Sequence, residues 1–151
     1  MRAAAIDLGS VRVGVAVSDE LGLMAHVRPY LDGRDPGRLI GQLRALAVEE
    51  GIELFVVGLP RNLDGSEGPS ARRARQFAAQ LARGSHVRVE LMDERWTTRE
   101  ALARLRAQGI DARRARSKVD SAAAAIVLQA WLDGNQSSFG ESPSHHGKDD
   151  P

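Results

Sequence analysis

The sequence AIDLGS at residues 5–10, followed by VRVGVAVSD at residues 11–19, decides the fold of this chain. An apolar run that holds one carboxylate, Asp7, leads into a glycine-containing turn, after which valines alternate with other residues. This pattern predicts a strand over residues 2–7, a tight turn and a second strand over 11–18. Because a carboxylate on a central strand is costly to bury without compensation, we expect a cation beside Asp7, and a metal ion is our hypothesis.

Downstream of this hairpin the hydrophobic pattern switches between the periods of strands and helices. The predicted elements are a third strand over 23–31, a helix over 37–50, a strand over 52–57, a helix over 70–82, a strand over 87–91, a helix that begins near Thr97, and a last helix from Ser117 or Lys118 to about Leu132. A three-strand antiparallel meander followed by two parallel strands, with flanking helices, predicts an α/β fold with a mixed five-stranded sheet. A right-handed crossover places the first strand centrally, beside the strand at 52–57.

The composition is that of a globular domain. A length of 151 residues is enough for one domain with a core. Hydrophobic residues make up 42% and charged residues 27%, which is ordinary for a globular protein. The chain has no cysteine, so disulfides, thiolate zinc sites and thiol nucleophiles are excluded. No apolar run approaches the ~20 residues of a membrane span, and the first apolar run is broken at Asp7. We therefore expect a cytoplasmic protein with no membrane contact.

The net charge of +1 conceals an uneven distribution. The segment 134–151 holds three acids and one lysine, so the 20 basic and 17 acidic residues that remain give the rest of the chain a charge of +3. Between Arg95 and Lys118 there are eight basic residues against two acids, and nearly all of the eight are arginine. Arginine binds phosphate in a bidentate manner, which favours a nucleic-acid partner. A solvated arginine-rich surface is the alternative that charge alone leaves open.

Four carboxylates stand where predicted elements begin or end. Asp7 ends the first strand, Asp93 and Glu94 end the strand before the basic segment, and Asp120 opens the last helix. Adjacent strand residues face opposite sides, so at most one of Asp93 and Glu94 points toward Asp7. Each acid also has a structural explanation: Asp7 as a turn cap, Asp93 and Glu94 as a solvated strand end, and Asp120 as an acid favoured by the helix dipole.

Taken together, these acids favour a site for divalent metal ions. Hard carboxylate oxygens suit Mg²⁺ or Mn²⁺. The histidines at 26, 86, 145 and 146 are not near these acids in the predicted elements, so they are not candidate ligands. Two such ions held by shared carboxylates form the arrangement that cleaves phosphodiester bonds. We therefore predict a nuclease site with two bound ions, formed by Asp7, by one of Asp93 and Glu94, and by Asp120.

Four blocks of sequence resemble one known family. They are AIDLG with RVGVAVSD (5–19), VVGLPRNLDGS (56–66), DERWTT (93–98) and KVDSAAA (118–124). In this order, over about residues 1–133, they resemble the YqgF family, also called RuvX, of the RNase H-like superfamily. The strand at 52–57 runs into Gly58 without the acid that many members of the superfamily carry there, and Ala123 and Ala124 stand where RuvC-like resolvases carry a further acid.

The resemblance implies an RNase H-like nuclease domain over 1–133 and metal-dependent cleavage at Asp7, Glu94 and Asp120. Residues 134–151 lie outside it, and because they lack periodicity we expect a disordered tail there. The family is described as a nuclease that matures the 5′ end of pre-16S rRNA, and also as a Holliday junction resolvase by similarity to RuvC. The expected partners are therefore an rRNA precursor or branched DNA, bound by a monomer or a homodimer.

The residues expected to hold the nucleic-acid backbone are mostly arginines around the loop at 59–68 and the basic segment. They are Arg12, Arg61, Asn62, Arg72, Arg73, Arg75, Arg95, Arg99, Arg113, Arg114, Arg116 and Lys118. Two alternatives stay open at this point. One is a non-catalytic nucleic-acid-binding module whose acids are structural, and the other is a phosphotransferase, because an Asp-Leu-Gly turn after a first strand also occurs in actin-like ATPase folds. A length of 151 residues is short for that two-lobed architecture.

Overall fold

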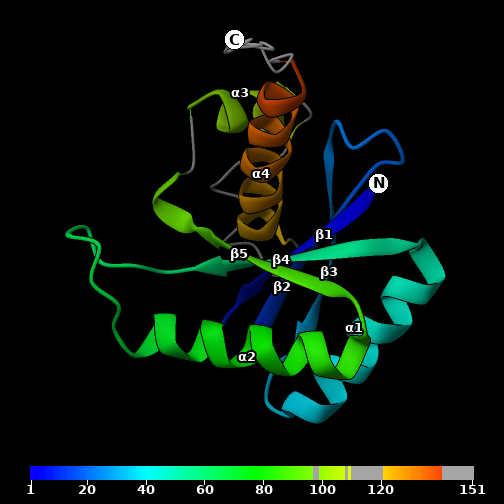
Figure 1. The fold of residues 1–151 in the computed structure, drawn as a ribbon, viewed down its shortest axis with the longest axis vertical. Helices are drawn as coiled ribbons and strands as arrows, with labels where there is room; N and C mark the ends of the chain where they lie inside the picture. Colours follow the sequence, from blue (N-terminus) through cyan, green and yellow to red (C-terminus); the bar gives the residue numbers. More distant parts are fainter. Residues whose placement is uncertain (97–98, 108, 110–120, 141–151) are drawn as a thin grey trace, which may run out of the picture.

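Five strands form one mixed sheet in the order β3-β2-β1-β4-β5, as a computed structural model of the chain shows (Figure 1). Their bounds are β1 (Arg2–Leu8), β2 (Arg12–Ser18), β3 (Ala25–Asp32), β4 (Ile52–Leu59) and β5 (Arg88–Asp93). The structure describes residues 1–96, 99–107, 109 and 121–140, without the side chains of Trp96 and 136–140. β1 is central, antiparallel to β2 and parallel to β4, which confirms the predicted sheet.

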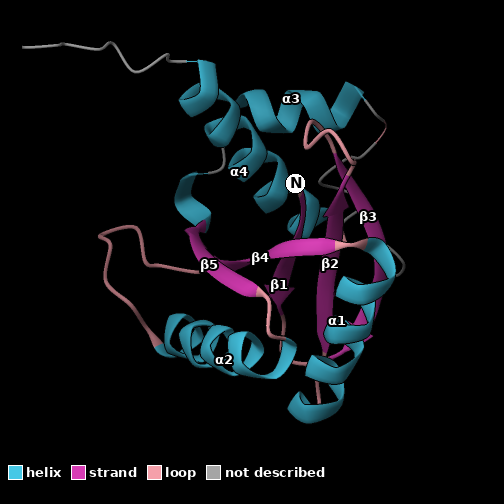
Figure 2. Ribbon diagram, turned by 45° about the vertical axis from the view of Figure 1, so that its right-hand side comes forward, coloured by secondary structure: helices cyan, strands magenta, loops and turns pink. Residues whose placement is uncertain are grey.

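Helices cover both faces of the sheet. Their bounds are α1 (Pro36–Glu50), α2 (Pro69–Ser85), a short 3-10 helix η1 (Glu94–Trp96), α3 (Arg99–Ala107) and α4 (Ala122–Gly140). Figure 2 shows α1 and α2 on one side of the sheet and α3 and α4 on the other. Among the described helices, none combines the length and the apolar character that a membrane span needs.

The alternation of side chains along β1 serves both layers of the core. Ala4 and Ile6 belong to the apolar cluster beneath α1 and α2, whereas Ala3 and Ala5 belong to the cluster beneath α4. All four side chains are fully buried. A strand that is buried on both faces reads as a nearly continuous apolar run, which is why Asp7 stands out in the sequence.

Local sequence signals predict the ends of α1 correctly but not the end of α4. The Asp35 carboxylate accepts a hydrogen bond from the Arg38 amide at the start of α1, and Gly51, with φ +67°, ends that helix as predicted. The prediction that the last helix ends near Leu132 and Gly134 is wrong, because α4 continues to Gly140. Gly134 is not among the glycines with positive φ, so it does not adopt the left-handed conformation that stops a helix.

A buried glutamine ties α4 to the end of the β2–β3 turn. The Gln129 side chain is fully buried, accepts a hydrogen bond from the Ala25 amide at 3.0 Å, and donates to the Leu23 carbonyl at 3.0 Å. Its amide also donates to Asp133 Oδ1 at 3.0 Å. One side chain thereby satisfies backbone groups at the edge of the sheet that the α4 layer shields from water.

Replacing Gln129 tests how much these hydrogen bonds contribute to the free energy of unfolding. We expect Gln129→Leu to lower the free energy of unfolding by about 2–4 kcal/mol, because it leaves the Ala25 amide and the Leu23 carbonyl unpaired. Urea denaturation followed by circular dichroism measures the change. Gln42→Leu, at an exposed position of α1, is the control and should change stability by less than about 0.5 kcal/mol. Equal effects of the two substitutions would contradict the role given to Gln129.

Candidate active site

Two of the predicted carboxylates meet at the carboxyl end of the sheet. Asp7 lies near the end of β1, on the face that carries Ala3 and Ala5 and therefore toward α4. Glu94 is the first residue of η1, directly after β5 ends at Asp93. The carboxyl end of a sheet with parallel strands is where open α/β folds place their sites.

The strand between them makes their meeting possible. β4 lies between β1 and β5, so adjacent strand spacings of ~4.8 Å put two strand widths between the backbones of the two acids. A Cβ atom at Gly58, near the end of β4, would lie 2.7 Å from Glu94 Oε1 and 3.3 Å from its Cγ. The Glu94 side chain thus occupies the space that any other residue at this position would fill. The role of Gly58 in leaving room for Glu94 was not predicted. The signal for it is a glycine at the end of a buried strand, which indicates close approach of another group.

The Glu94 carboxyl group is perturbed by its surroundings, Asp7 included. Partial burial of Glu94, the negative charge of Asp7 and a side-chain hydrogen bond to Asp7 together raise the pKa of Glu94 to about 7. Each of these causes favours the protonated form of the Glu94 carboxyl group. A cation bound beside the pair would favour the ionised form of Glu94 instead.

Helix α4 closes over this site because the residues at the contact are small. A Cβ atom at Gly14, which pairs with Asp7 across β1 and β2, would lie 3.4 Å from the Asp7 Cβ, 3.5 Å from the Ala124 Cβ and 3.7 Å from the Ser121 Cβ. The Ser121 hydroxyl donates to the Arg28 carbonyl at 2.6 Å and fixes the start of the helix against β3. Asp120, the third predicted acid, lies outside the described residues.

Two hollows open on either side of the acidic pair, and both are lined by Asp7 and Glu94. The first extends toward α2, where Pro60 and Ser70 line it. The second extends toward α4, where Ala123 and Ile126 line it. A substrate group can therefore approach the two carboxylates from either layer of the fold.

Asp93 faces away from the acidic pair, as strand alternation predicts. Its carboxylate, of which 4% is exposed, accepts hydrogen bonds from Arg95 Nε at 3.0 Å and Arg95 Nη2 at 2.7 Å, and lies 3.5 Å from Arg61 Nη1. The Arg95 guanidinium holds the pKa of Asp93 below its ordinary value. Two adjacent acids thus have different environments, since Asp93 pairs with arginines whereas Glu94 approaches Asp7.

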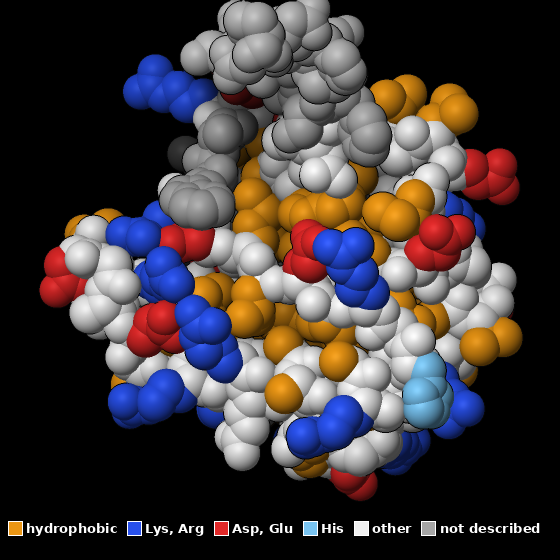
Figure 3. Space-filling model, viewed as in Figure 1, with side chains coloured by type: hydrophobic (Ala, Val, Ile, Leu, Met, Phe, Trp, Pro, Cys, Tyr) orange, Lys and Arg blue, Asp and Glu red, His pale blue; other side chains and the backbone are white. Residues whose placement is uncertain are grey.

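The same ion pairs order the loop between β4 and α2. Glu67 bonds to Arg75 and lies 3.3 Å from Arg61 Nη2, while the Asn62 amide donates to the Ser66 hydroxyl at 2.9 Å. Figure 3 shows arginine and acidic side chains interleaved at the edge of the molecule where this loop lies. Four of the predicted nucleic-acid contacts, Arg61, Asn62, Arg75 and Arg95, are therefore engaged within the protein.

The other predicted contacts fall into three groups. Arg73 Nη2 donates to the Gly9 carbonyl at 3.1 Å, beside the turn that follows Asp7. Arg72 and Arg99 are exposed, and Arg12 lies with its guanidinium carbon 5.8 Å from the centre of the Tyr30 ring. Arg113, Arg114, Arg116 and Lys118 lie outside the described residues.

The donor set fits a hard divalent cation. Asp7 and Glu94 offer carboxylate oxygens and excess negative charge in a partly enclosed space. Within the described ranges, no group of three or more histidine or acidic residues is placed to hold a metal ion. The described part of the site thus supplies two carboxylates.

The raised pKa of Glu94 has a consequence for stability. Between about pH 4.5, its ordinary value, and pH 7, the folded chain holds a proton that the unfolded chain has lost, so the free energy of unfolding falls as the pH rises. We expect Glu94→Gln to be more stable than the wild type by about 1–2 kcal/mol at pH 8 without divalent metal, after allowance for solvent screening. Urea denaturation at pH 8 and pH 4 measures this.

The difference should vanish near pH 4, where the wild-type carboxyl group is neutral in both states. Glu53→Gln, at an exposed position of β4, is the control and should show no such pH dependence. A Glu94→Gln variant that is less stable than the wild type at pH 8 would contradict the electrostatic strain described here.

The chain is similar to known proteins of one family over most of its length. The family described as "RuvX: Holliday junction resolvase" matches residues 1–134. A protein of Anaeromyxobacter sp. (strain Fw109-5), named "Putative pre-16S rRNA nuclease", is 47% identical over 134 residues, which cover 89% of this chain and 98% of that protein. A protein of the same name from Streptomyces coelicolor is 46% identical over 134 residues, with 87% of this chain and 80% of that protein covered.

A solved structure confirms the predicted fold. The structure of T. thermophilus RuvC in complex with a Holliday junction substrate aligns with a TM-score of 0.61 at 15% identity and covers 91% of this chain and 97% of that one. At this identity the likeness concerns the fold. With the match over residues 1–134 and relatives above 45% identity, the chain belongs to the RuvX family.

Proposed function

We propose that this chain is a nuclease, a hydrolase of phosphodiester bonds, which acts with a divalent metal ion on nucleic acid. The names of its family and of its relatives support the nuclease class. The observation that carries the proposal is the meeting of Asp7 and Glu94 across Gly58, with the pKa of Glu94 raised to about 7. A fold that only binds nucleic acid has no need of two mutually repelling carboxylates at this position.

Asp7 and Glu94 would hold the metal, with Asp120 as the third ligand. The proposal for Asp120 rests on the position of Ser121, the next residue along the chain, whose Cβ approaches the β1–β2 pair at Gly14. Mg²⁺ and Mn²⁺ are the ions that suit three carboxylates, and the predicted number is two.

The reaction assigns a separate task to each part of the site. A bound divalent ion supplies a lowered pKa for a water molecule and charge stabilisation for the departing oxygen. Asp7 and Glu94 present their oxygens from opposite sides of Gly58, so they fix where a scissile phosphate must lie. Arg73, held against the Gly9 carbonyl, supplies a cation next to this position for a neighbouring phosphate.

The substrate that the relatives favour is the 5′ extension of pre-16S rRNA, processed in the cytoplasm during ribosome biogenesis. The name of the 47%-identical relative supports this substrate. The alternative is a RuvC-like Holliday junction resolvase in DNA recombination and repair, which the description of the family supports. A resolvase that cuts two equivalent strands is expected to be a symmetric dimer, whereas an RNA-processing nuclease can act as a monomer.

A cleavage assay tests the site and the substrate together. The labelled substrates are a 5′-extended pre-16S rRNA fragment, a plain single strand and a synthetic four-way junction, each with Mg²⁺ or Mn²⁺. We expect defined trimming of the rRNA fragment and a loss of ~100-fold or more in the separate variants Asp7→Asn and Asp120→Asn, because each removes a charged ligand. Asp35→Asn is the control, since asparagine also caps a helix.

The assay separates the alternatives. Paired symmetric nicks in the junction would replace the rRNA proposal with the resolvase. Full activity in Asp7→Asn, or no Asp7-dependent cleavage of any substrate, would overturn the nuclease site. Calorimetric titration with Mn²⁺ adds an independent readout, in which Asp7→Asn should lose binding and Asp35→Asn should retain it.

Gly58 offers a second test of the same geometry. We expect Gly58→Ala to fold, because φ at this position is not in the left-handed region, but to displace the Glu94 carboxylate, which lies 2.7 Å from the new methyl carbon. Cleavage should fall by about tenfold or more. The control is Gly41→Ala, at a position of α1 where an added Cβ meets nothing within 4 Å. Unchanged cleavage in Gly58→Ala would show that the position of Glu94 is not critical.

A further inference from the structure

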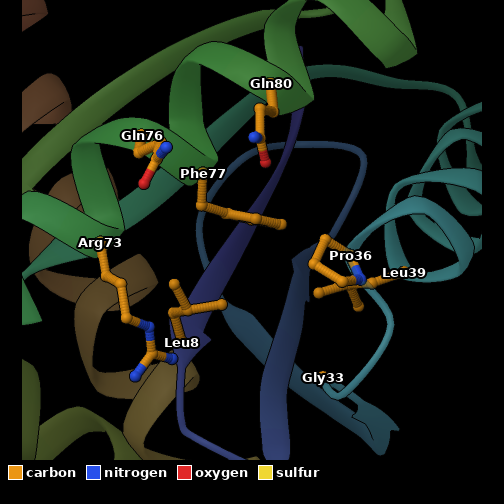
Figure 4. Close-up of a pocket in the computed structure, with 8 residues that line it drawn as sticks. All are labelled: Leu8, Gly33, Pro36, Leu39, Arg73, Gln76, Phe77 and Gln80. Carbon is orange, nitrogen blue, oxygen red and sulfur yellow. The ribbon is translucent and has the colours of Figure 1, made fainter.

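A separate hollow of about 190 Å³ lies on the other face of the sheet, between α2 and the start of α1 (Figure 4). Leu8, Pro36 and Phe77 form an apolar floor for it. Its volume is below the ~300–1,000 Å³ of pockets for drug-sized ligands, so it suits a smaller chemical group. Neither Asp7 nor Glu94 lines it.

The hollow is built by close approach of two turns. The Gly33 amide, after β3, donates to the Val11 carbonyl, after β1, at 2.7 Å. A Cβ atom at Gly33 would lie 2.7 Å from Val13 Cγ2 and 3.6 Å from the Gly9 carbonyl oxygen. The β3–α1 turn is therefore held against the β1–β2 turn, and one wall of the hollow is fixed by backbone contacts.

The opposite wall is a polar stripe on α2. Arg73, Gln76 and Gln80 line the hollow from one face of the helix, as the spacing of three and four residues requires (Figure 4). Gln80 is half-buried and Gln76 exposed, and neither side chain forms a hydrogen bond with any other residue that the structure describes. An amide group offers both donors and an acceptor, the combination that reads the edge of a nucleobase.

The hollow adjoins the acidic site and is bordered by positive charge. Leu8 lines both this hollow and the one that contains Asp7 and Glu94, so a single strand residue separates the two. Arg72 and Arg38, on the two helices that form the hollow, make no ion pair with another described residue. The acids nearest in sequence are engaged, since Asp35 caps α1 and Asp32 pairs with Arg34. Arg73 lines the hollow and binds the Gly9 carbonyl, so a polyanion that reaches Asp7 meets an arginine at the hollow itself.

We propose that this hollow binds one unpaired nucleobase of the strand that is cleaved, next to the scissile phosphate. The inference rests on the proposed nuclease function and specifies its substrate as nucleic acid that is single-stranded beside the cleavage site. A base within a duplex is stacked and its pairing edge is occupied, so entering a hollow between two helices requires it to leave the stack. A single strand makes a base available with the least loss of stacking energy.

Binding without cleavage tests the proposal. Fluorescence anisotropy in a chelator measures the affinity of the full chain for a short single-stranded RNA, the corresponding DNA, an abasic strand of the same length and a duplex. We expect the wild type to prefer the RNA over the abasic strand by about tenfold, and Gln76→Ala/Gln80→Ala to lose this preference. Gln42→Ala, an exposed glutamine on α1, is the control and should keep it. Equal preference for the DNA strand would assign the hollow to single strands of either sugar.

The amide signals of the two glutamines give a second readout by NMR. We expect the side-chain NH₂ resonances of Gln76 and Gln80 to shift with the base-containing strand and not with the abasic strand. Shifts of equal size with both strands would overturn the base-binding hollow, and so would an unchanged preference in the double variant. If Asp7-dependent cleavage were still observed, the nuclease proposal would stand. Absence of both binding and Asp7-dependent cleavage would instead remove the nuclease proposal itself.

Discussion

The close approach of Asp7 and Glu94, which the sheet imposes, is the constraint on which the candidate site depends. Two carboxyl groups that raise the pKa of one of them to about 7 do not approach each other unless the backbone compels them. β4 is hydrogen-bonded to β1 on one side and to β5 on the other, and this pairing brings Asp7 and Glu94 together. Packing of the sheet thereby stores an electrostatic cost at one point, and a bound cation would remove it.

Small residues are what allow the layers to close around this point. Gly58 leaves room for Glu94 across β4, and Gly14 leaves room for α4 beside Asp7. The alanines of α4 that face the sheet, such as Ala124, are fully buried. Larger side chains would hold the helix away from the sheet, and the second hollow beside the acidic pair would be wider and more open to water.

Arginine has two functions around the site. Arg61 and Arg95 neutralise Asp93 and tie down the loop after β4, so part of the positive charge that the sequence displays is used internally. Arg73 is anchored through one nitrogen to the Gly9 carbonyl and keeps its other donors available. Composition counts these arginines equally, whereas the structure shows that Arg61 and Arg95 form ion pairs with Asp93 and that Arg73 binds a backbone carbonyl.

The sequence by itself determined the sheet, the family and the list of acids. Periods of 2 and 3.6 residues are local properties, so the strands, the cap at Asp35 and the stop at Gly51 could be predicted from neighbouring residues. The residue pattern left Asp93 and Glu94 open and the family resemblance named Glu94. Tertiary structure shows the physical reason, because β5 ends at Asp93 and that carboxylate is bound by Arg61 and Arg95 while Glu94 approaches Asp7. It also decided that α4 passes Gly134, since a glycine stops a helix only where the chain turns into the left-handed conformation.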